Sequence, residues 1–199
     1  MRSRRCSDAG QAFPIYITVV GGLLFLAFAY FAVGQAAANR NDARTAADAA
    51  ALAAAQHKRD QLAGAWAQNV LDPSQWQDIF DGKAEGLGLS CWRADQLAAQ
   101  NDATVLSCVS DGPLDFTVEV RTNDSVGDSI VPGTEQMKSQ EKATAVIEPR
   151  CDFDPLTEEG GEDALPLLTC DGEEWELDPK DPDPLLPEPQ DLFEVHLAD

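Results

Sequence analysis

Residues 15–34 read IYITVVGGLLFLAFAYFAVG, and residues 36–55 continue as AAANRNDARTAADAAALAAA. At a helical rise of about 1.5 Å per residue, the first stretch spans the roughly 30 Å hydrocarbon layer of a bilayer. The second stretch has alanine at twelve of its twenty positions, and alanine is the best helix former. We therefore predict one continuous helical rod from about Pro14 to Leu71, apolar in its first half and rich in alanine in its second.

The charge of the chain is distributed unevenly. The 199 residues include 14 Lys and Arg against 35 Asp and Glu, which gives a formal charge of −21. Residues 9–39 carry no charge, and the remainder of the chain after them holds 34 acids and 11 bases. A region this acidic repels phosphate backbones, so nucleic acid is not an expected partner. The uncharged run also argues against a purely soluble cytosolic protein.

The flanks of the apolar run predict its orientation. Arg2, Arg4 and Arg5 precede it, and the positive-inside rule then places the N-terminus in the cytoplasm and everything after Asn39 outside. We expect a single-pass protein of the cell membrane. A cleavable secretory signal is the alternative, because Ala36-x-Ala38 fits a cleavage site. The apolar core of such a signal is usually only about 7–15 residues long, so a retained anchor is favoured.

Five cysteines follow the same division. Cys6 lies on the cytoplasmic side and should stay reduced. Cys91, Cys108, Cys151 and Cys170 lie outside, and an even number in an oxidising compartment indicates disulfides with three possible connectivities. We favour the local pairs Cys91–Cys108 and Cys151–Cys170, because each would join a short segment to a neighbouring strand. A structural zinc site is the alternative, but the chain has no Cys-x-x-Cys pair.

The remainder of the chain predicts a small α+β domain. Residues 73–101 suggest a short helix, a glycine-rich connection and another short helix near 93–100. Alternating apolar residues predict strands at 104–109, 115–122, 141–147 and 192–197. Asp171-Gly172, between residues 167–170 and 174–177, is a hairpin signal. The proline-rich residues 178–189 are expected to form an extended tether.

The predicted fold class is α+β: a long N-terminal membrane-spanning helix continues into an alanine-rich helix and then into a small, disulfide-stapled antiparallel β-sheet ectodomain. The expected division is a basic cytoplasmic leader at 1–10, a transmembrane helix at 11–38, an alanine-rich extracytoplasmic helix at 39–72, an α+β ectodomain at 73–150, and an acidic, proline-rich segment with a hairpin and a last strand at 151–199.

Motifs of catalysis are not found in the sequence. Only two histidines occur, and both His57 and His196 are predicted to be solvated surface groups. There is no Gly-x-Ser-x-Gly elbow, no phosphate-binding loop and no His-Glu-x-x-His. We therefore expect no enzyme, no catalytic residue, no metal site and no cofactor. The spacing from Asp152 does not fit an EF-hand, which leaves only weak calcium binding as a possibility.

Three features of the N-terminal third resemble a known family. Gly10-Gln11-Ala12 stands directly before the apolar run, and the membrane helix continues into a second helical segment. The most specific feature is TAADAAALAAA at residues 45–55. Its central residues are Ala46, Ala47, Asp48, Ala49, Ala50, Ala51 and Leu52. On these features, residues 9–56 resemble the TadE/TadG-like proteins of tight-adherence (Tad) pilus systems, which are relatives of type IV pilins.

The resemblance implies a minor pilin or a pilus-assembly subunit that is embedded in the lipid bilayer and contacts other pilus-system subunits. It also implies processing by a prepilin peptidase between Gly10 and Gln11. Substrates of that kind usually carry Glu at the fifth position of the mature chain, whereas this chain has Ile15 there. That departure favours residence in the membrane without polymerisation.

Two functional hypotheses follow. The first is a non-enzymatic, membrane-anchored pilus-assembly or minor pilin-like protein of a tight-adherence (Flp/Tad) system, acting by helix-mediated subunit contacts. The alternative is a membrane-anchored or secreted acidic module that binds a cationic ligand or calcium. The alanine face of the helix could pack either on its own domain or on neighbouring copies. Asp48 could be a solvated helix residue or could hydrogen-bond to a partner.

Overall fold

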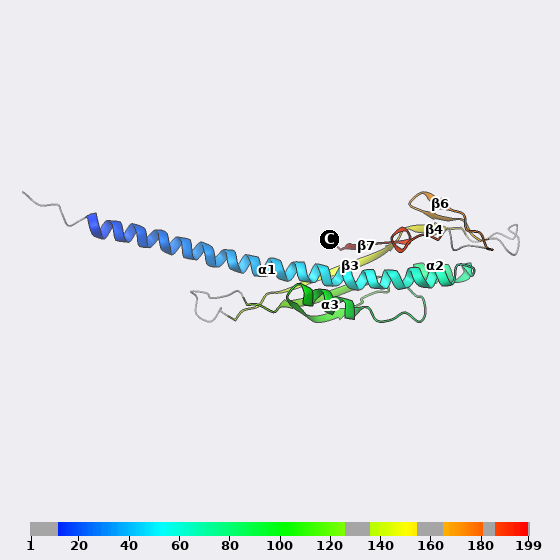
Figure 1. The fold of residues 1–199 in the computed structure, drawn as a ribbon, viewed down its shortest axis with the longest axis horizontal. Coiled ribbons are helices and arrows are strands. Elements are labelled where there is room, and N and C mark those ends of the chain that lie inside the picture. Colours follow the sequence, from blue (N-terminus) through cyan, green and yellow to red (C-terminus); the bar gives the residue numbers. More distant parts are fainter. Residues whose placement is uncertain (1–11, 126–135, 155–164, 181–185, 199) are drawn as a thin grey trace, which may run out of the picture.

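The computed structural model describes residues 12–125, 136–154, 165–180 and 186–198. It is dominated by one helix, α1 (Ala12–Gln68), whose first half projects alone and whose second half lies along a sheet (Figure 1). At 1.5 Å per residue this helix is roughly 85 Å long. The continuous rod and the α+β class predicted from the sequence are both confirmed, since α1 has no break between the apolar and the alanine-rich stretches.

The main sheet has four antiparallel strands in the order β1-β2-β3-β7. They are β1 (Ala103–Val109), β2 (Asp115–Thr122), β3 (Gln140–Pro149) and β7 (Phe193–Leu197). The four predicted strands are therefore confirmed to within a few residues. Alternate residues of a strand face the same side, and the buried side of β2 and β3 consists of Phe116, Val118, Val120, Ala143, Ala145 and Ile147.

A strip of alanines on α1 packs on this face. The strip consists of Ala46, Ala47, Ala50, Ala51, Ala54 and Ala55, all fully buried. Their spacing places them on one side of a helix with 3.6 residues per turn, and a methyl side chain lets the helix backbone approach the strands closely. The alanine face therefore packs on the chain's own domain. This observation decides between the two packing partners that the sequence left open.

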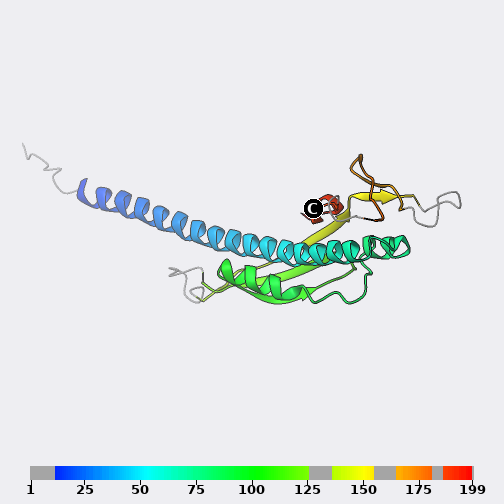
Figure 2. The ribbon, with the colours of Figure 1, turned by 45° about the vertical axis from the view of Figure 1, so that its right-hand side comes forward.

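Short helices flank the second half of α1. A 3₁₀ turn, η1 (Pro73–Gln75), leads into α2 (Trp76–Phe80), and α3 (Cys91–Gln100) follows a glycine-containing connection, as predicted. Ala94 and Ala98 of α3 are buried one helical turn apart against α1 and β1. Figure 2 shows the twisted sheet crossing α1, with α3 on one side of the helix and β7 on the other.

A second sheet lies at the end of the domain far from the projecting helix. It comprises β4 (Cys151–Phe153), β5 (Leu168–Cys170) and β6 (Glu173–Trp175), all antiparallel. Asp171 and Gly172 both have positive φ, 49° and 85°, and they form the two-residue turn between β5 and β6. Two positive φ values are what a type I′ hairpin requires, and aspartate and glycine adopt them readily. The predicted hairpin is confirmed.

Aromatic side chains join the two sheets to the far end of α1. Trp66 of α1 lies 5.4 Å from Trp76, measured between ring centroids, and Trp76 lies 5.3 Å from Phe153 of β4. Phe80 lies 5.4 Å from Phe193 of β7. Aromatic pairs at these separations add about 0.5–1.5 kcal/mol each beyond the area that they bury.

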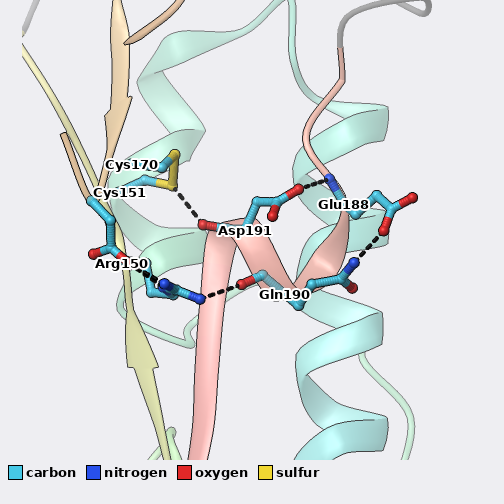
Figure 3. The surroundings of a disulfide bond; sticks show 7 residues. Arg150, Cys151, Cys170, Glu188, Gln190 and Asp191 are labelled. Carbon is cyan, nitrogen blue, oxygen red and sulfur yellow. Dashed lines mark hydrogen bonds and ion pairs between the residues drawn. A yellow bond between two sulfur atoms is a disulfide. The ribbon is translucent and has the colours of Figure 1, made fainter. Parts of the chain in front are cut away.

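Arg150 links the segments around β4 by polar contacts (Figure 3). Its Nε donates to Oδ2 of Asp171 at 2.6 Å, and one terminal nitrogen donates to the carbonyl of Gln190 at 3.1 Å. Gln190 belongs to α4 (Pro189–Leu192), so the extended tether expected up to residue 189 ends earlier, where this helical turn begins. Residues 181–185 of the tether lie outside the described residues. The hydrogen bond and the charge of Asp171 raise the pKa of Arg150.

Both predicted disulfides are present. Cys91–Cys108 joins the start of α3 to β1, and Cys151–Cys170 joins directly opposed residues of β4 and β5. The linked cysteines are 17 and 19 positions apart. In the chain-entropy model, loops of this length stabilise the fold by about 3 kcal/mol each, through the unfolded state.

The packing predicts the effect of enlarging a strip alanine. Ala47→Leu should lower the free energy of unfolding by about 1–3 kcal/mol, because the sheet leaves no room for the added carbons. Ala49→Leu is the matched control, since Ala49 is only half-buried on the flank of the same helical turn. Denaturant unfolding of the full chain in detergent measures both. Equal stability of the two variants would contradict the close packing.

Candidate functional site at the base of the projecting helix

The first half of α1 is an uncovered apolar surface. Its large exposed side chains, from Phe13 at 72% to Val33 at 70%, are all more than half exposed, and the most apolar window of the helix has no buried residue. It is long and apolar enough to cross a membrane, with a mean hydropathy of 2.2 in its most apolar window. A soluble monomer rarely exposes so large an apolar area, so this half of α1 requires lipid or a partner around it. The finding is consistent with a single-pass membrane protein.

Asn39 marks the point where α1 meets its domain. It is the first buried residue of the helix, at 8% exposure. Its Nδ2 donates to the carbonyl of Asp124 at 3.2 Å, and its Oδ1 accepts from the Ser139 backbone N–H at 3.2 Å and from the Thr122 hydroxyl at 3.3 Å. Both ends of the amide are satisfied, as a buried amide requires. Asn39 thus fixes α1 to the residues that follow β2 and precede β3.

One turn of helix around Asn39 also carries an ion pair. Nε of Arg40 lies 2.6 Å from Oε1 of Glu141 on β3. The hydrogen bond to Glu141, and then its charge, raise the pKa of Arg40. The Arg40 side chain is 77% exposed, so this is a surface ion pair and contributes little to stability. It orients the two side chains more than it stabilises the fold.

Two grooves flank α1 at this level. The first, here called the acidic groove, lies between α1 and the ends of α3 and β2, and Asp42, Asp102 and Asp124 line it together with Asn39 and Thr45. Gln100, Asn101 and Thr122 complete its lining, which contains no Lys or Arg.

The second, here called the basic groove, lies between α1 and the strands β3 and β7. Arg40, Arg44 and Lys142 line it, together with the carboxylates Asp48 and Glu141. The remaining lining residues are uncharged. Sequence reasoning missed both grooves, because α3, β2 and β3 bring their residues to α1 from more than 50 positions away.

The residues of the alanine-rich motif at 45–55, here called the signature, divide between the core and the surface. Ala46, Ala47, Ala50 and Ala51 are fully buried against the sheet, while Ala49 and Leu52 are half-buried. Asp48 is half-buried beside the basic groove, and within the described residues its side chain makes no hydrogen bond or ion pair. Most of the signature therefore specifies how close α1 lies to its own sheet.

The prediction that His57 is solvated is wrong. His57 is half-buried, and its Nδ1 lies 3.1 Å from the Ser90 hydroxyl and 2.9 Å from Nε2 of Gln61. Its ring and that of Trp92 form a T-shaped pair with centroids 5.1 Å apart. It fastens the start of α3 to α1. His196, by contrast, has a 41% exposed side chain, 3.8 Å from Glu148. In the part of the chain that the structure describes, no three His, Cys, Asp or Glu side chains are grouped to hold a metal ion.

Comparison with known proteins agrees with the resemblance seen in the sequence. Residues 10–57 match the family model described as putative Flp pilus-assembly TadE/G-like. The match covers the apolar half of α1 and the signature, and it ends before the sheet begins. No curated protein and no solved structure matches the chain significantly. Gly10 and Gln11 fall within the match but lie outside the described residues.

The role of Asn39 is testable. Asn39→Ala removes one of two partners from the Ser139 N–H and from the Asp124 carbonyl, and both keep the Thr122 hydroxyl, so the free energy of unfolding should fall by about 1 kcal/mol. Amide hydrogen exchange should also accelerate at residues 122–124 and 139. Asn41→Ala is the matched control, because Asn41 is exposed on the same turn. Unchanged exchange at Ser139 in Asn39→Ala would show that the amide does not hold the junction.

Proposed function

We propose that this chain is a non-enzymatic, membrane-anchored subunit of a tight-adherence pilus-assembly system. The observation that carries the proposal is one unbroken helix with two different surfaces. Its first half is apolar and uncovered, and its second half bears the family signature and is packed on a folded domain. Such a helix holds a rigid domain at a fixed distance from a membrane.

The orientation follows from charge and redox chemistry. The arginines before the span favour a cytoplasmic N-terminus, with residues 1–10 as the leader and 11–38 as the span. The domain that carries Cys91–Cys108 and Cys151–Cys170 then lies on the oxidising side, where disulfides persist. Processing between Gly10 and Gln11 by a prepilin peptidase would leave the span at the start of the mature chain.

The minor pilin-like part of the proposal concerns the surface that meets other subunits. Ala47 and Ala51 are covered by the chain's own sheet, so they are not that surface. We assign the subunit-contacting surface to the uncovered first half of α1 and to the flanks of its base. The second function suggested by the sequence, an acidic module for a cationic ligand or calcium, is not favoured by the family match.

The orientation predicts a labelling pattern. A membrane-impermeant maleimide on intact cells should label Gln56→Cys, which is exposed on the second half of α1, and should leave Cys6 unlabelled. After the membrane is permeabilised, Cys6 should react as well in the unprocessed chain, which retains residues 1–10. The control is the same Gln56→Cys chain with Cys6→Ser. Labelling of Cys6 in intact cells would mean that the span is inserted the other way or is not retained.

The role of the helix surface predicts the result of a span exchange. A deletion strain should lose its surface appendages, and the unaltered chain should restore them. A chain whose residues 15–34 are replaced by a leucine–alanine helix of equal length should insert and form both disulfides yet fail to restore them, because it lacks the native helix surface. Electron microscopy of the cells gives the readout. Full restoration by the generic span would reduce α1 to an anchor.

A further inference from the structure

The two grooves at the base of α1 carry opposite charge. The acidic groove presents the carboxylates of Asp42, Asp102 and Asp124 and no cation. Across the described residues, none of these three side chains makes an ion pair or a hydrogen bond. The basic groove presents Arg40, Arg44 and Lys142, which outnumber its two carboxylates, Asp48 and Glu141. Arg40 pairs with Glu141, and the side chains of Arg44 and Lys142 have no partner among the described residues.

The grooves lie at the same level on different sides of the helix. Successive residues of an α-helix are about 100° apart, so Asp42 and Arg40 point in nearly opposite directions while differing by only about 3 Å along the axis. The sheet order gives the same result, because β2 and α3 border the acidic groove and β3 and β7 border the basic groove. Both grooves begin within a turn of Asn39, where α1 leaves the domain.

We infer that the occupant of each groove is a second copy of this chain, with the acidic groove of one copy against the basic groove of the next. Two copies inserted in one membrane have parallel spans and equal heights, so a lateral step alone brings the two grooves together. The contact joins two different surfaces, so it is heterologous and leaves a groove free at each end. It builds a row or a ring rather than a closed pair.

Charge distinguishes this occupant from a lipid headgroup. Asp48 and Glu141 stand beside the cations of the basic groove and meet either occupant, but an anionic headgroup would leave the acidic groove uncovered. A second copy covers both. Exposed ion pairs are individually weak and are screened beyond about 8 Å at physiological salt. Confinement to the membrane plane raises the effective concentration of the copies, so several weak ion pairs are sufficient to hold two copies together.

The inference rests on the proposed membrane anchoring but not on any role in appendages. Experiments on the purified chain therefore test the contact between copies independently of appendage assembly. The full chain is reconstituted in phosphatidylcholine vesicles with donor and acceptor dyes on Cys6, the cysteine outside both disulfides. Energy transfer between copies should exceed the random level and return to it in 1 M salt. Intact transfer together with unchanged appendages in the deletion strain would contradict the proposed function alone.

Charge exchange tests the pairing of the grooves. One variant carries Arg44→Glu with Lys142→Glu, and the other carries Asp42→Lys with Asp124→Lys. Each alone should reduce transfer to the random level, because like charges then face each other. An equal mixture of the two should restore it. The control, Arg93→Glu with Lys180→Glu, makes the same change of charge away from both grooves and should leave transfer unchanged.

A cross-link on the unaltered chain covers the case in which a variant fails to fold. A zero-length carbodiimide applied to mixed ¹⁴N- and ¹⁵N-labelled copies should join Lys142 of one copy to Asp42, Asp102 or Asp124 of another. The inference is overturned if mixed-isotope links at these residues are missing, or if correctly folded single variants keep full transfer. Loss of both signals in phosphatidylglycerol vesicles would identify the headgroup as the occupant and would overturn it equally.

Discussion

The close contact between α1 and the main sheet is the constraint on which the remainder of the structure depends. A four-stranded sheet of this size covers little area, and a helix with large side chains would stand away from it. The alanine strip removes that distance, so the strand residues Val118 and Ile147 reach the helix and become fully buried. The low area that each alanine buries is offset by the length of the strip, which runs through three turns of α1.

Larger side chains replace alanine where the sheet ends. Leu62 and Trp66 are also fully buried on α1, and Trp66 packs on Trp76 of α2. The second sheet depends on this aromatic contact and on Arg150, because its own three short strands bury little.

Local patterns predicted the elements, and contacts between distant residues made the site. The apolar run, the alanine-rich stretch, the alternation at residues 115–122 and the Asp171-Gly172 turn each act within a few positions, so they could be predicted from the sequence. The pairing of Cys91 with Cys108 also followed from short separation. Asn39 and His57 could not be predicted, because their partners lie 33 to 100 positions away, and the two grooves join residues that are more than 50 positions apart. The one sequence signal that marked Asn39 is its place as the first residue of the polar stretch 39–42, directly after the apolar run.

The absence of any break in α1 between its two halves has a mechanical consequence. A span that leans in its membrane carries the domain with it as a lever, because no hinge lies between them. The packed half of α1, from residue 39 to residue 68, is about 45 Å long, so a tilt of about 20° moves the far sheet sideways by roughly 15 Å. A rotation of the span about its axis turns the domain by the same angle. Small movements of the span within the bilayer therefore become larger displacements of the second sheet, β4–β6.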